Sequence, residues 1–208
     1  MAITIQPAQN GPYLVKGATT VVRNADGKAF EAKGSCALCR CGGSRNKPFC
    51  DGTHASNGFK SARSDERLPN KIDNYEGTGI TIHDNRGLCA HAGVCTDNLP
   101  EVFRIRQEPW IDPDGAEAAR VAQVVARCPS GALSYTLNQR LYRDTGDAES
   151  ISFAPNGPYV VCGAQLEGVD PPQGFSDHCT LCRCGGSKNK PFCDGTHWNL
   201  KFDEHAEA

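Results

Sequence analysis

Two stretches of the chain carry the same arrangement of metal-ligating side chains. In each stretch a Cys-x-Cys pair is followed, after eight residues, by Cys-x3-His. The two sets are Cys39, Cys41, Cys50 and His54, and Cys182, Cys184, Cys193 and His197. Three thiolates and one imidazole form a complete four-donor set for an iron–sulfur cluster or a zinc ion. Because twelve cysteines occur without a recognisable secretory signal, the sequence predicts metal ligation before disulfides.

The two sets belong to an internal repeat. Residues 39–54 and 182–197 differ at a single position, which is Arg45 in the first and Lys188 in the second. A second matched piece lies upstream in each half, at residues 10–17 and 156–163. Self-similarity of this kind is typical of repeated structural units. We therefore expect two homologous modules on either side of an unrelated middle segment.

Around these ligands the sequence resembles the CDGSH iron–sulfur family, whose pattern is C-x-C-x2-[S/T]-x3-P-x-C-D-G-x-H. The chain satisfies this pattern twice. The other matching positions are Ser44, Pro48, Asp51 and Gly52, and Ser187, Pro191, Asp194 and Gly195. Thr53 and Thr196 stand where the family name has Ser. The resemblance implies one [2Fe–2S] cluster per module, with two Cys on one iron and a Cys and the His on the other.

A zinc ion is the main alternative to an iron–sulfur cluster in the end modules. Cys36 and Cys39 could join Cys50 and His54 in a tetrahedral Cys3His site that leaves Cys41 spare. The equivalent set in the second module is Cys179, Cys182, Cys193 and His197. The family resemblance favours the iron–sulfur cluster, and it leaves Cys36 and Cys179 as packing residues beside that cluster.

The middle segment offers a third group of thiols, Cys89, Cys95 and Cys128, the last followed by Pro129. This segment resembles divergent mono-cluster bacterial ferredoxins, which show C-x2-C-x2-C followed by a distant C-P. Ala92 occupies the second cysteine position of that run. The resemblance implies one [3Fe–4S] cluster, which needs three thiolates, or one [4Fe–4S] cluster with a fourth ligand. The alternative is a ferredoxin-like unit that has lost its cluster.

The elements that must position these ligands are short. Residues 12–15 and 158–161 predict strands, and residues around Ile80, 102–105 and 133–137 predict strands in the middle segment. Asp112 and Pro113 predict the start of a helix that ends before Pro129. We expect an α+β fold with modules at 1–65 and 146–208 and a ferredoxin-like domain at 66–145. The two β-rich modules are expected to pack as an internal pseudo-dimer in a monomeric chain.

These features predict an electron-transfer protein and not an enzyme. The chain has no Gly-rich nucleotide fingerprint and no nucleophile motif. A net charge of −2 predicts no binding to nucleic acid, and no apolar run approaches the roughly 20 residues of a membrane span. We expect a cytoplasmic protein whose partners are a reductase and an acceptor. The alternatives are storage, sensing or transfer of clusters to apo-proteins, and a zinc-stabilised interaction module.

Overall fold

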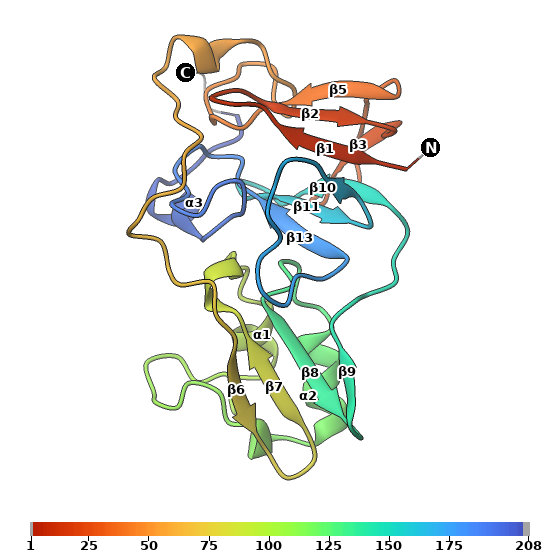
Figure 1. The fold of residues 1–208 in the computed structure, drawn as a ribbon, viewed down its shortest axis with the longest axis vertical. Helices are drawn as coiled ribbons and strands as arrows, with labels where there is room; N and C mark the ends of the chain where they lie inside the picture. The colour runs from red at the N-terminus through yellow and green to blue at the C-terminus, as the bar shows by residue number, and fades with distance from the viewer. Residues whose placement is uncertain (1, 206–208) are drawn as a thin grey trace.

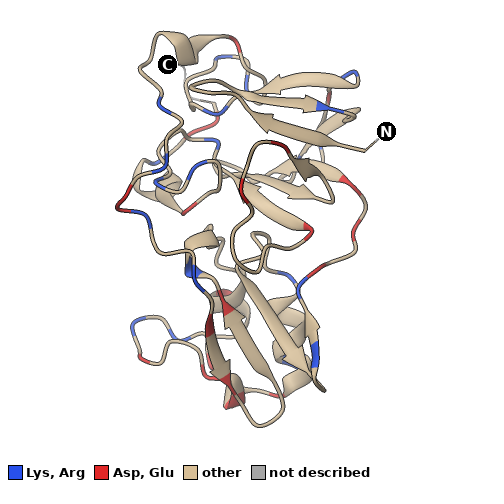
Figure 2. Cartoon of the chain, in the orientation of Figure 1, with Lys and Arg blue, Asp and Glu red and all other residues tan. Residues whose placement is uncertain are grey.

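The computed structural model describes residues 2–205, and it contains three small sheets. Figure 1 shows three tiers along the long axis, with the first module uppermost, the second module in the centre and the middle domain lowest. The fold is α+β, as the sequence predicts, with strands far outnumbering helices. Figure 2 shows that acidic and basic residues are interspersed through all three tiers.

The uppermost sheet has the strand order β12-β1-β2-β5. Its strands are β1 (Thr4–Pro7), β2 (Tyr13–Lys16), β5 (Ser35–Leu38) and β12 (Gln165–Leu166). Strand β12 belongs to the second half of the chain, and it pairs in parallel with β1. The first module therefore completes its sheet with a strand from the second module.

The central sheet has the order β13-β11-β10-β3-β4. Its strands are β3 (Thr20–Arg23), β4 (Ala29–Glu31), β10 (Ser150–Phe153), β11 (Tyr159–Cys162) and β13 (His178–Leu181). Here β3, from the first half, pairs in parallel with β10. Each of the two sheets thus contains strands from both halves of the chain.

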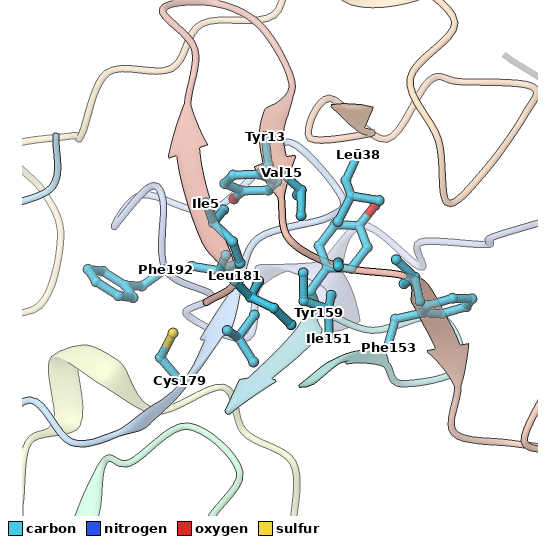
Figure 3. Packing of buried hydrophobic residues seen from close by; sticks show 14 of the residues in the cluster. Ile5, Tyr13, Val15, Leu38, Ile151, Phe153, Tyr159, Cys179, Leu181 and Phe192 are labelled. Carbon is cyan, nitrogen blue, oxygen red and sulfur yellow. The ribbon is translucent and has the colours of Figure 1, made fainter. Parts of the chain in front are cut away.

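One hydrophobic core lies between these two sheets. Alternate side chains of β2 and β11 are buried, which is the pattern of a strand with one face covered. Figure 3 shows Tyr13 and Leu38 from the first half packing with Tyr159 and Leu181 from the second. The rings of Tyr13 and Tyr159 meet edge to face with their centroids 6.0 Å apart. The two modules therefore bury their apolar faces against each other.

The middle domain has its own sheet and its own core. The strand order is β6-β7-β8-β9. These strands are β6 (Asp73–Glu76), β7 (Thr81–Asp84), β8 (Leu133–Leu137) and β9 (Arg140–Tyr142). Helix α2 (Ala118–Val125) buries one apolar face against this sheet. The other helical elements are η2 (Arg86–Leu88), α1 (Val94–Asn98) and η3 (Pro113–Gly115) in this domain, and η1 (Thr53–Ala55) and α3 (Thr196–Asn199) in the end modules.

Two sequence predictions for the middle domain are wrong. The helix expected from Asp112 is interrupted: η3 ends at Gly115, Ala116 is extended, and α2 begins two residues later. A side chain at Gly115 would clash with the Glu101 carbonyl oxygen, so the turn depends on a close approach of the two backbone segments. The strand expected at 102–105 is reduced to one bridge between Phe103 and Ile111.

None of the helices within residues 2–205 has the length and apolar character of a membrane span.

Candidate metal centres

The structure brings each predicted ligand set of the end modules together as two pairs. In the first module the Sγ atoms of Cys39 and Cys41 are 3.9 Å apart, and Cys50 Sγ lies 3.3 Å from His54 Nδ1. In the second module the equivalent distances are 3.9 Å between the Cys182 and Cys184 sulfurs and 3.4 Å from Cys193 Sγ to His197 Nδ1. The same donor geometry is therefore built twice.

Backbone hydrogen bonds close each ligand loop. Cys39 N donates to Pro48 O at 2.8 Å, and Cys50 N donates to Ala37 O at 2.8 Å. These bonds extend the strand β5 into the loop, so the first and last cysteines lie side by side. The same pair of bonds, from Cys182 N and Cys193 N, closes the second loop.

The contacts of Asp51 give this loop aspartate a structural role. Asp51 accepts hydrogen bonds from Arg45 N at 2.9 Å, from Thr53 N at 3.0 Å and from the Thr53 hydroxyl at 2.7 Å. These bonds lower the pKa of the Asp51 carboxyl far below its usual value. Because Thr53 supplies a hydroxyl as Ser would, the departure from the family name keeps the hydrogen bond that orients the Cys50–His54 turn.

One thiol of each Cys-x-Cys pair is favoured as a thiolate. A hydrogen bond from the neighbouring thiol lowers the pKa of Cys41 to about 5 and that of Cys182 to about 7, and the same interaction raises the pKa of the partner thiols Cys39 and Cys184. Burial raises the pKa of Cys193. Gly43 N and Gly52 N each point at a ligand sulfur, Cys41 and Cys50, at 3.4 Å. Thiolates stabilised by N–H donors are the form that binds iron or zinc. The donor set therefore fits the metal centre that the resemblance implies.

The cysteines that zinc would need lie elsewhere. Cys179 is 2% exposed within the core shared by the two modules, and Cys36 packs against the same core. Burial raises the pKa of Cys179 to about 12 and that of Cys36 to about 11. The geometry favours the paired ligands of a cluster.

The three thiols of the middle domain line one cavity of about 650 Å³. Cys89 follows η2, Cys95 lies in the first turn of α1, and Cys128 lies between α2 and β8. Burial raises the pKa of Cys89 and raises that of Cys95 to about 11. The structure thus gathers the three predicted ligands from three different segments.

Two side chains at this cavity were not foreseen from the sequence. The Arg86 guanidinium lies 3.8 Å from Cys89 Sγ and stacks 3.7 Å from the centroid of the Trp110 ring. A cation beside a thiolate stabilises its negative charge. No spacing rule links these residues to the cysteines, so the local sequence offered no signal for either.

Each module also holds the ligand loop of the other through a buried tyrosine. The Tyr13 hydroxyl shares its proton between the carbonyl oxygens of Cys182 and Pro191, both at 2.9 Å. The Tyr159 hydroxyl makes the reciprocal bonds to Cys39 O and Pro48 O, both at 2.9 Å. The matched Pro-Tyr pairs of the repeat were the available sequence signal for this contact.

Comparison with known proteins identifies all three units. Residues 10–55 and 156–198 match the family described as iron-binding zinc finger, CDGSH type. Residues 75–138 match the family described as divergent 4Fe-4S mono-cluster. The chain is 39% identical over 61 residues to the uncharacterized protein YjdI of Escherichia coli K12, and equally to YjdI of Escherichia coli O157:H7. Each alignment covers 29% of this chain and 80% of YjdI.

No solved structure matches the chain. The family matches confirm the resemblance found in the sequence. The chain is an iron–sulfur-binding protein of the CDGSH family, in which two CDGSH domains flank a divergent 4Fe–4S mono-cluster domain.

Proposed function

We propose that this protein is a one-electron carrier with three iron–sulfur centres. The observation that carries the proposal is the pairing of the ligands, two sulfurs on one side and a sulfur with an imidazole on the other, in both end modules. Each module would hold a [2Fe–2S] cluster with these four side chains. Cys89, Cys95 and Cys128 would hold a [3Fe–4S] or [4Fe–4S] cluster in the middle domain.

When bound, an iron–sulfur cluster takes up and releases single electrons at a potential that its ligands set. Three thiolates and one neutral imidazole leave an oxidised [2Fe–2S] centre less negative than four thiolates do. We therefore expect potentials of about −300 to 0 mV, between plant-type ferredoxins and Rieske centres. The protein's contribution is to hold the thiolates and to keep the ligating nitrogens of His54 and His197 free of protons.

We also propose that the end modules form an internal pseudo-two-fold pair, so that the chain acts as a monomer. The support is reciprocal: β12 joins β1 while β3 joins β10, and Tyr13 and Tyr159 each bind the other module's loop. The proposed domains are residues 1–65, 66–145 and 146–208. The proposed partners are a reductase and an electron acceptor, and the chain itself would catalyse no reaction.

Transfer of clusters to apo-proteins is the second candidate, and one observation favours it. Cys50 and His54 are only partly buried, so the first module's ligands are open to an acceptor protein. Two measurements distinguish electron transfer from cluster transfer. Stopped-flow reduction by a ferredoxin-type reductase without loss of cluster supports electron transfer, whereas colour that moves to an added apo-ferredoxin supports cluster transfer.

A further inference from the structure

The ligand loops of the second module and the middle domain are in direct contact. A side chain at Gly195, between Cys193 and His197, would lie 2.5 Å from Cδ2 of the His91 ring. The Trp198 indole N–H donates to His91 O at 3.1 Å. His91 is two residues from the ligand Cys89. The two sites therefore touch through the residues next to their ligands.

Two further hydrogen bonds join the second module to the middle domain. The Asn189 side-chain amide donates to Gly87 O at 2.7 Å, and Asn189 is 8% exposed. The His178 Nε2 donates to the carbonyl oxygen of Cys128 at 2.9 Å. Both ligand-bearing segments of the middle domain, around Cys89 and around Cys128, are thus fixed to the second module.

The repeat provides an internal comparison for this contact. Gly52, the counterpart of Gly195, has nothing within 4 Å of the position where a Cβ would stand. Asn46, the counterpart of Asn189, is exposed. His197 is 5% exposed and Cys193 is 2% exposed, whereas their counterparts in the first module are only partly buried. Nearly identical loops therefore have different surroundings.

The second module also touches the first module at its ligand loop. The backbones of Cys41 and Cys184 pair in an isolated antiparallel β-bridge, and both thiols are free. Gly42 lies so close to the partner loop that a side chain there would be 2.6 Å from Cys184 O, and Gly185 lies equally close to Cys41 O. Figure 1 shows the corresponding order, with the second module between the other two units.

From these contacts we propose that the second module is the relay of the molecule. It exchanges electrons with the middle domain across the His91–Gly195 contact. It exchanges electrons with the first module across the backbone β-bridge between Cys41 and Cys184. The first module is then the terminal, solvent-facing site. This inference rests on the proposed function, because it requires a redox centre in each of the three units.

The electron balance of the relay is simple. One electron from an external one-electron donor, such as a reduced flavin semiquinone, enters the middle centre. The middle centre would be oxidised again when it gives up that electron, and the centre of the second module would be reduced by it. The same electron then passes to the first module, and no bond or proton changes at any stage.

The first test uses electron paramagnetic resonance of the reduced full-length chain. His54→Cys and His197→Cys mark the two modules, since each replacement shifts the signal of its own module. Cys95→Ala removes the middle centre. We expect Cys95→Ala to slow the spin relaxation of the second module's signal several-fold and to leave that of the first module unchanged, because only the second module has the middle centre as a neighbour.

The outcomes separate this inference from the proposed function. A wild-type chain with only about four irons lacks the middle centre and overturns both. A chain with about seven or eight irons in which Cys95→Ala slows both signals equally, or only that of the first module, overturns the relay alone.

The second test targets the contact with a matched pair of variants. Asn189→Ala removes the bond to Gly87 O, whereas Asn46→Ala changes the exposed counterpart. After photoreduction by less than one electron per chain, we expect Asn189→Ala to slow electron arrival at the second module several-fold and Asn46→Ala to have no effect. Trp198→Phe, which keeps an aromatic ring but loses the indole N–H that donates to His91 O, should act in the same direction. Equal rates in all four proteins would contradict the proposed route.

Discussion

At the scale of single residues, the two ligating histidines differ in their surroundings although their motifs are nearly identical. His197 is buried, in the loop that contacts the middle domain, and burial lowers the pKa of its imidazole because the charged form is disfavoured. His54 is partly exposed. Since a proton and iron compete for the same nitrogen, this difference should appear as a difference in acid stability.

We expect the cluster of the first module to be lost before that of the second as the pH falls. The bound histidine carries no proton at Nδ1, so release takes up a proton and is favoured below the pKa of free histidine, about 6.5. For His197 the lowered pKa moves protonation to lower pH, and the cluster is retained longer. Visible absorbance followed from about pH 8 to pH 5 measures the two steps.

Replacing one histidine at a time assigns each step. His54→Cys should make the first module acid-stable and lower its potential, and His197→Cys should do the same for the second. The middle centre has only thiolate ligands among its predicted set, so it should not share the histidine-dependent step. Identical loss of colour in the wild type and in both variants at every pH would contradict imidazole ligation.

Replacing the buried tyrosine of one module should change the metal centre of the other module. Tyr13→Phe removes the hydroxyl that binds Cys182 O and Pro191 O, and it should destabilise the protein by about 1–3 kcal/mol. Because the lost bond holds the opposite loop, the spectrum and potential of the second module should change. Tyr159→Phe should change those of the first. Denaturant unfolding and redox titration check both, and a change confined to the mutated tyrosine's own module would be contrary to this contact.

At the scale of elements, short strands determine which cysteines are ligands and which are core residues. Cys179 lies on β13, opposite Val161 of β11, and its side chain is in the core between the sheets. Cys182 follows the end of that strand, where the chain turns into the ligand loop. Only Thr180 and Leu181 therefore separate a packing cysteine from a predicted ligand.

We expect Cys179→Ala to keep the full iron content, because Cys179 contacts the core and not the metal. Its cost should be a modest loss of stability, of about 1 kcal/mol, from the smaller buried side chain. Cys182→Ala is the matched control, and it should lose the iron of the second module. Iron analysis of both purified variants decides between the cluster and a zinc site that uses Cys179, for which Cys179→Ala would lose metal.

The ligand sets and the order of the units could be predicted because they depend on local motifs. Eleven candidate ligands followed from spacing and resemblance, and strand β8 was predicted with its observed bounds, Leu133–Leu137. The pairing of β3 with β10 could not be predicted, since a four-residue strand carries no local information about its partner. The break at Ala116 arises from a contact between Gly115 and Glu101, which only the folded chain brings together.

At the scale of the whole molecule, the two end modules are joined more extensively than the linkers suggest. Two sheets contain strands from both halves of the chain, and one core lies between these sheets. Residues more than 140 positions apart in the sequence are therefore in contact. The linker around Arg67 is exposed by comparison. The linker is therefore not what keeps the modules together.

Cutting this linker should leave the molecule intact. A protease site introduced at residues 64–68 would separate the first module from the rest of the chain. We expect the two fragments to elute together in size-exclusion chromatography and to keep their colour, because the strand pairing and the core remain. Fragments that separate without denaturant would contradict the shared-sheet arrangement.

The central claim is that the chain holds two clusters in its CDGSH modules and a third in its middle domain. Iron and acid-labile sulfide, measured per chain on anaerobically purified protein, test it most directly. We predict about seven or eight irons with a near-matching amount of sulfide, and in the case of seven an electron paramagnetic resonance signal in the oxidised protein from a [3Fe–4S] centre. A colourless protein that contains zinc and no sulfide would contradict the claim.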